Sequence, residues 1–202
     1  MHPPFREASM TISCRTSAAR GWAIASLATA LGIFAPAVAG GVEDWVGVYK
    51  TKFDNAMVSG EKFLSENVIE IVKVGSDAAY VRVHLEFYNA HTCDLWVVAS
   101  ADADQLVYQA PHGTKTMGDG CTLTITRDDG TLTLHDADGA CRNYSCGVRG
   151  SIDGASFPLR AKGTIHRVRR IKRSYEYKEA VAEWKNGPSI LPRASPVARG
   201  NP

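Results

Sequence analysis

Between Trp45 and Leu159, apolar and polar residues alternate with a period of two. Successive side chains of a β-strand point to opposite faces, so this pattern predicts strands that bury one face and expose the other. In the clearest run, residues 80–88, apolar side chains alternate with an arginine, a histidine and a glutamate. We expect about eight short strands, at residues 45–53, 67–74, 80–88, 95–99, 106–109, 121–127, 131–135 and 156–159.

The segments between these strands are short and carry turn-forming residues. Asp128-Asp129-Gly130 separates two of the expected strands, and a glycine at this place supplies the positive φ that a tight hairpin turn needs. The sequence therefore predicts a mainly β fold with antiparallel pairing. A meander that closes into a small barrel is favoured because closure removes exposed strand edges. A two-sheet sandwich is the alternative.

The composition changes near Arg160. Residues 165–185 are rich in Arg, Lys, Glu and Ala, with apolar residues at near-helical spacings, and Asn186-Gly187-Pro188 would end a helix. We expect one C-terminal helix, supported by surface pairs between its glutamates and Lys178. The predicted organisation is a signal at 1–39, a β-barrel domain at 40–159, a basic helix at 160–187 and a disordered tail at 188–202.

The amino terminus predicts export. Three arginines precede an apolar run from Trp22 to Phe34, which ends at Pro36-Ala37-Val38-Ala39, a small-x-small cleavage pattern. The run is shorter than the ~20 residues that a membrane-spanning helix needs. We expect a periplasmic or secreted protein with no transmembrane helix in the mature chain.

Cysteine usage agrees with export. Cys14 would leave with the signal, and an even number of cysteines in the remaining chain predicts two disulfides, which allow three pairings. The close spacing of the last two cysteines favours a local loop. The predicted pairs are Cys141–Cys146 and Cys93–Cys121.

Charge is distributed very unevenly. Residues 40–159 carry 9 basic and 17 acidic side chains, whereas residues 160–202 carry 11 basic and 3 acidic ones. Phosphate contacts would suit a basic run of this kind. A nucleic-acid partner is not expected, because the chain is predicted to be exported and aromatic residues are not interleaved with the charges. Attraction to an anionic membrane surface or wall polymer, and docking of the basic segment on the acidic body, both stay open. The densest run is Arg167, Arg169, Arg170, Lys172 and Arg173.

No catalytic or metal-binding set is predicted. His91 and Cys93 could begin a zinc site, but disulfides account for the cysteines. The aspartates at 128–138 do not follow the twelve-residue calcium loop pattern. The mature chain has no Gly-x-Ser-x-Gly nucleophile motif, and His84 and His135 are expected on the solvent faces of their strands. We therefore expect no metal and no cofactor, and an enzyme is the third hypothesis.

Two stretches, 89–95 (NAHTCDL) and 141–154 (CRNYSCGVRGSIDG), resemble segments that recur in small exported bacterial proteins. The opening Trp45-Val46-Gly47-Val48-Tyr49 is similar to the first strand of lipocalin-like (calycin) barrels. The resemblance covers roughly residues 45–159 and implies a periplasmic β-barrel module without implying an activity. Some proteins of similar build inhibit lysozyme, but their Ser-Gly and Lys-Gly inhibitory loops are not found here.

Two functional hypotheses follow. The first is an exported binding or inhibitor-type module without catalytic activity that recognises an envelope protein or an anionic polymer. Its candidate binding residues are the basic run at 167–173 together with Arg142 and Arg149 beside the expected short disulfide. The second is a lipocalin-like carrier that holds a small apolar ligand inside the barrel. The sequence does not predict the oligomeric state.

Overall fold

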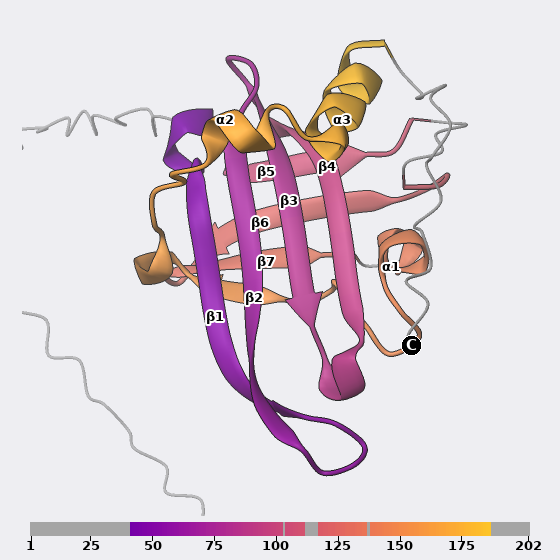
Figure 1. Ribbon diagram of the computed structural model, residues 1–202. Helices are drawn as coiled ribbons and strands as arrows, with labels where there is room; N and C mark the ends of the chain where they lie inside the picture. Colours follow the sequence, from indigo (N-terminus) through magenta and orange to yellow (C-terminus); the bar gives the residue numbers. More distant parts are fainter. Residues whose placement is uncertain (1–40, 103, 112–116, 137, 187–202) are drawn as a thin grey trace, which may run out of the picture. The chain divides into compact units, whose positions relative to one another are not determined.

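The computed structural model describes residues 41–102, 104–111, 117–136 and 138–186 (Figure 1). The expected signal at 1–39 and the expected tail at 188–202 lie outside the described residues. No helix within the described ranges is long and apolar enough to cross a membrane. The strands are β1 (Gly47–Ala56), β2 (Lys62–Lys73), β3 (Ala78–Glu86), β4 (Thr92–Asp102), β5 (Gln105–Gln109), β6 (Thr122–Asp128), β7 (Thr131–His135) and β8 (Ser156–Pro158).

Helical segments are few. The α-helices are α1 (Ala140–Ser145), α2 (Val168–Ile171) and α3 (Tyr175–Asn186), and the short 3₁₀ helices are η1 (Val42–Asp44), η2 (Tyr88–Ala90) and η3 (Leu159–Ala161). The described chain is therefore mainly β with a C-terminal helix, as the sequence predicts.

The strands pair in chain order from β1 to β8, and every pair is antiparallel. Past β8 the chain returns to β1, where Val48 and Gly163 exchange backbone hydrogen bonds of 3.0 and 2.7 Å. Strand β4 pairs with β3 over most of its length but with β5 only through its last three residues. The sheet therefore changes direction between β4 and β5. In Figure 1 the β5–β8 strands run behind and across the β1–β4 strands. This nearly closed meander barrel is the topology that the strand pattern favours.

Alternating burial confirms the predicted strand faces. On β3 the side chains of Val81, Val83 and Leu85 are buried, while the alternating residues Arg82, His84 and Glu86 are partly exposed. The barrel interior is filled by large side chains, among them Trp45, Tyr49 and Phe157, each with no exposed surface. At the turn between β6 and β7, Asp129 and Gly130 both have positive φ, of 46° and 74°, which matches the tight hairpin expected from Asp-Gly.

The outer face of the β2–β4 layer is also partly buried, because the C-terminal segment covers it. Val72, Tyr80 and Val98 on this face pack against Ile165, Ile171 and Ala180 in a second apolar cluster. Figure 1 shows α2 and α3 lying across one end of this layer, opposite the end where the β1–β2 hairpin extends past the other strands. The C-terminal segment is thus packed on the barrel.

The predicted C-terminal helix is present as α3, but the bounds 165–185 are too long, because α2 is a separate short helix and residues 172–174 lie between the two. Ser174 sits before the first residue of α3 and its Oγ accepts the backbone N–H of Tyr177 at 3.2 Å. A serine in this position caps the start of a helix by satisfying an N–H group that has no partner within the helix. The cap fixes a new helix start, so the chain changes direction after Ile171.

Candidate functional site

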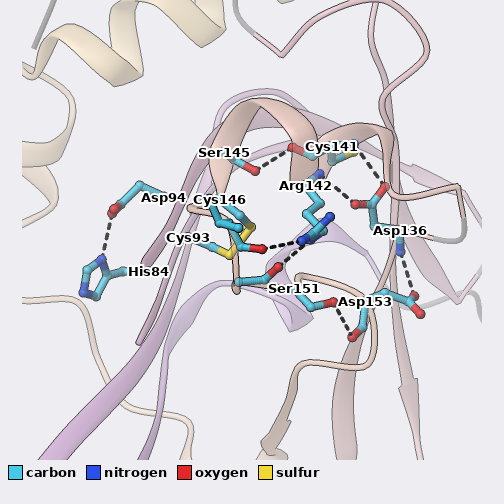
Figure 2. Close-up of a disulfide and its surroundings, with 12 residues drawn as sticks. His84, Cys93, Asp94, Asp136, Cys141, Arg142, Ser145, Cys146, Ser151 and Asp153 are labelled. Carbon is cyan, nitrogen blue, oxygen red and sulfur yellow. Dashed lines mark hydrogen bonds and ion pairs between the residues drawn. A yellow bond between two sulfur atoms is a disulfide. The ribbon is translucent and has the colours of Figure 1, made fainter. Parts of the chain in front are cut away.

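The four cysteines form two disulfides, but the predicted pairing is wrong. The pairs are Cys93–Cys146, which Figure 2 shows, and Cys121–Cys141. Helix α1 separates Cys141 from Cys146, and a helix rises ~1.5 Å per residue, which puts them ~7.5 Å apart along its axis. A disulfide cannot bridge Cα atoms more than ~7 Å apart without backbone movement, so this local pair does not close. Cys146 instead forms a β-bridge with Cys93 of β4.

Arg142, one of the candidate binding residues, has a structural role. Its guanidinium donates from Nε to the carbonyl of Gly150 at 2.6 Å and from Nη2 to the carbonyl of Val148 at 2.8 Å (Figure 2). These bonds fasten the turn that follows Cys146. Arg149 lies on the same turn and is exposed. The structure therefore does not aim the two arginines at a common ligand position.

Asp136, which the sequence analysis did not single out as a functional residue, holds the start of α1. Its buried carboxylate accepts the backbone N–H groups of Cys141 at 3.1 Å and Arg142 at 2.8 Å, as Figure 2 shows. The backbone N–H of Asp136 is in turn bound by Asp153 at 2.9 Å. A carboxylate at a helix start is favourable because the N–H groups there have no helical partner. These hydrogen bonds stabilise the region around the disulfides, whose role is therefore structural.

The predicted basic run lies on α2 and its flanking residues, and all five of its members are exposed. Arg167 is anchored: its Nε and Nη2 donate to Oε1 of Glu70 on β2 at 3.1 and 3.0 Å. Arg82 of β3 lies on the other side, with its Nη1 3.4 Å from Oε2 of the same carboxylate. The Glu70 side chain is only 4% exposed, so two guanidinium groups compensate a charge that is largely removed from water.

The other cations of the basic run do not form an ion pair of this kind. Within the described ranges, none of these four residues forms an ion pair with a carboxylate: Arg169, Arg170, Lys172 and Arg173. The basic segment is thus docked on the barrel, but among its five cations Arg167 is the one that pairs with a described barrel carboxylate. The remaining four cations form what we call the α2 basic face, which presents its charge to solvent.

A pocket of about 320 Å³ lies beneath this face, between β3, α2 and the start of α3. The polar residues among its lining are three arginines, one tyrosine, one serine and one glutamate. The side chains concerned are those of Arg82, Arg167, Arg170, Tyr80, Ser174 and Glu176. The pocket is therefore rich in hydrogen-bond donors.

Tyr80 is the least expected member of this lining. The residue has no exposed surface, its ring packs edge-on against Tyr177 at 5.0 Å, and its hydroxyl has no hydrogen-bond partner. Burial raises the pKa of Tyr80, the charge of Arg82 opposes this shift, and Glu176 and Glu70 add to it. The hydroxyl therefore keeps its proton and stays a donor over the physiological range.

Two buried glutamates hold α3 in place. Oε1 of Glu183 accepts the Tyr108 hydroxyl at 2.8 Å, and Glu179 accepts the Trp96 indole N–H at 3.2 Å and the Tyr175 hydroxyl at 3.1 Å. Both glutamates are only 3% exposed, so the expectation that they form surface pairs with Lys178 is wrong. Burial, followed by the Glu183 charge, raises the pKa of Tyr108. A helix-period pattern alone does not show which glutamates face the barrel.

Neither His84 nor His135 lines this pocket. On β3, Nδ1 of His84 is 2.7 Å from Asp94 (Figure 2). Its Nε2 is 3.5 Å from Glu86, while Nε2 of His135 is 3.0 Å from Thr126 Oγ1. A hydrogen bond from Ser65, ahead of that from His84, lowers the pKa of Glu86. Among the residues that the structure describes, no cluster of three or more His, Cys, Asp or Glu is arranged to hold a metal ion.

A second open space lies at the opposite end of the β1–β4 layer. It is a groove of about 720 Å³ between the β1–β2 hairpin and η2, and its apolar lining includes Phe53, Phe63, Phe87 and Tyr88. The groove lies outside the filled barrel interior. A small apolar ligand would therefore have space in this groove at the end of the barrel, and not in the barrel interior.

No protein-family model, curated protein or solved structure matches this chain. The function is accordingly inferred from the geometry of the α2 basic face, the pocket beneath it and the groove.

Proposed function

We propose that this chain is an exported, non-catalytic binding module that recognises an anionic polymer of the cell envelope through the α2 basic face. The observation that carries the proposal is the set of four cations between Arg169 and Arg173 that are exposed and unpaired among the described residues. Exposed charges of one sign raise the local concentration of oppositely charged partners and speed their association.

The barrel presents these charges from a fixed position. Ile165 before the basic run and Ile171 within it are both buried, and Arg167 is bonded to Glu70 between them. The cations therefore stand on an anchored segment, which lowers the entropy lost when a partner binds. Two disulfides suit an oxidising compartment such as the periplasm or the cell exterior, which agrees with the signal expected at residues 1–39.

The test is the affinity of the mature chain, residues 40–202, for deacylated lipopolysaccharide, a phosphorylated glycan, measured by calorimetry at about 50 and about 300 mM salt. The variant replaces the four cations of the α2 basic face by glutamine. Near an anionic surface each Lys or Arg contributes up to about 1 kcal/mol, so we expect a loss on the order of a hundredfold at low salt.

A matched control carries the same change of net charge elsewhere. It replaces four other exposed cations by glutamine: Lys52, Lys62, Arg149 and Lys185. We expect this control to keep most of the affinity, and we expect wild-type binding to weaken as salt rises. Equal losses in the two variants, or binding that ignores salt, would contradict the proposal.

A small-ligand carrier is the second candidate, and the groove beside the β1–β2 hairpin favours it. The interior site expected for such a carrier is occupied by the protein's own side chains, so the ligand would lie against Phe63 and Tyr88 instead. Native mass spectrometry of the protein purified from the envelope of its host tests this candidate. A bound mass of a few hundred daltons that is lost on unfolding would favour the carrier.

A further inference from the structure

We propose that the pocket beneath the α2 basic face binds a single phosphate group, with Tyr80, Ser174 and three arginines as its donors. This inference rests on the proposed function and gives it a ligand: a phosphomonoester carried by the anionic envelope polymer. The α2 basic face would supply general attraction, and the pocket would supply recognition.

The first observation is the unused hydroxyl of Tyr80. A buried hydroxyl without a hydrogen bond costs about 1–3 kcal/mol, so most such groups in folded proteins have partners. Tyr80 lines the pocket, and the charges that act on its hydroxyl include Arg82 and Glu176, which line the pocket as well. A ligand oxygen in the pocket would provide the missing acceptor, after a small rearrangement of the exposed arginine side chains around it.

The second observation is the state of the other donors. Ser174 Oγ uses a lone pair to accept the Tyr177 N–H, which leaves its own O–H free to donate to a ligand. Arg167 uses Nε and Nη2 on Glu70, so its Nη1 has no acceptor within the described residues. Glu70 orients Arg82 and Arg167 toward each other, and the unpaired guanidinium of Arg170 completes the lining.

The chemistry of this donor set selects a tetrahedral oxyanion. Planar guanidinium groups donate two parallel hydrogen bonds to phosphate or carboxylate oxygens, and hydroxyl groups add donors from other directions. Five donor side chains exceed what the two oxygens of a carboxylate need but suit the three terminal oxygens of a phosphomonoester. The start of α3, at Ser174 and Glu176, adds the partial positive charge of a helix N-terminus.

Two carboxylates oppose an anion here. Glu70 is neutralised by its two arginines, whereas Glu176 lines the pocket and forms no ion pair with a cation among the described residues. Glu176 therefore weakens phosphate binding, which makes its removal a sensitive test because it predicts a gain rather than a loss. The pocket keeps a net positive charge because three arginines outnumber the two acids.

The experiment is calorimetric titration of the mature chain with inorganic phosphate and with glycerol 3-phosphate, using glycerol and chloride as blanks. We expect both phosphates to bind and the blanks not to bind. Tyr80→Phe and Arg170→Gln should each weaken phosphate about tenfold, since each removes one hydrogen bond to a charged acceptor. Glu176→Gln should tighten it severalfold. Tyr144→Phe and Arg149→Gln, at exposed positions away from the pocket, are the matched controls.

Vesicles separate the two sources of phosphate. If the ligand is a phosphomonoester on a lipid, the protein should bind vesicles with phosphatidic acid more tightly than vesicles with phosphatidylglycerol of equal charge. Free phosphate should then compete with the vesicles. Preference for free glycerol 3-phosphate alone would place the ligand on a small molecule or a glycan. If phosphate fails to bind, or if Tyr80→Phe and Glu176→Gln leave its affinity unchanged, the inference is wrong. Salt-sensitive binding of the polymer to the α2 basic face would then still stand.

Discussion

Two buried tyrosines on the same barrel should respond in opposite ways to loss of the same oxygen atom. Tyr80 is 0% exposed and its hydroxyl has no partner, whereas Tyr108 is 4% exposed and donates to Glu183 at 2.8 Å. Tyr80→Phe removes a desolvated group that makes no hydrogen bond, so it should raise the free energy of unfolding by about 1 kcal/mol. Tyr108→Phe takes a hydrogen bond from a buried carboxylate, so it should lower the free energy by about 1.5–3 kcal/mol.

The assay is urea unfolding of both variants followed by tryptophan fluorescence, with thermal melting as a second measure. For a domain of this size, 1 kcal/mol corresponds to a shift in Tm of about 2–4 °C. Added phosphate should raise the Tm of the wild type more than that of Tyr80→Phe, because bound ligand stabilises only the folded state. Destabilisation of about 1 kcal/mol in Tyr80→Phe without ligand would show that its hydroxyl has a partner, and the reasoning for the pocket would be refuted.

Two further predictions concern the disulfides and the acid end of the pH range. Trypsin should place the four cysteines in four different peptides, and we expect the first linked to the fourth and the second to the third: 83–115, 116–127, 128–142 and 143–149. The loops close over 53 and 20 residues, so removal of Cys93–Cys146 should cost about 4 kcal/mol and removal of Cys121–Cys141 about 3 kcal/mol, measured by urea unfolding. Linkage of the first peptide to the second and of the third to the fourth would contradict the fold. The pKa of Glu86 is lowered, first by the Ser65 hydrogen bond, so its contribution to stability is present above its unfolded pKa and is lost as pH falls through the folded pKa. Ser65→Ala should move that pKa upward in an NMR titration, and an unchanged titration would exclude Ser65 as the cause.

The strands could be predicted because their signal is local. A period of two follows from strand geometry alone, and the Asp129-Gly130 turn follows from the residues that tolerate positive φ. Chain order then favoured a meander, since sequential strands that are joined by short turns pair with each other. These features need no knowledge of distant contacts.

The remaining features depend on which distant segments meet. Cys93 pairs with Cys146 because the fold brings β4 to the end of α1, whereas the spacing of the cysteines in the chain favours the pair Cys141–Cys146. The helix glutamates look solvent-exposed until α3 is placed on β4, where Glu179 meets Trp96. The pocket likewise joins β3 to a segment that lies far along the chain, so its lining cannot be grouped from sequence alone.

The most direct test of the proposed function is the footprint of an anionic envelope glycan on the protein. The measurement is NMR chemical-shift mapping of isotope-labelled protein spanning residues 40–202, titrated with deacylated lipopolysaccharide. We predict that the shifts concentrate on residues 165–176 and on β3 at Tyr80 and Arg82, which surround the α2 basic face and its pocket. Shifts that concentrate instead on the groove beside the β1–β2 hairpin, at Phe63 and Tyr88, would contradict the account.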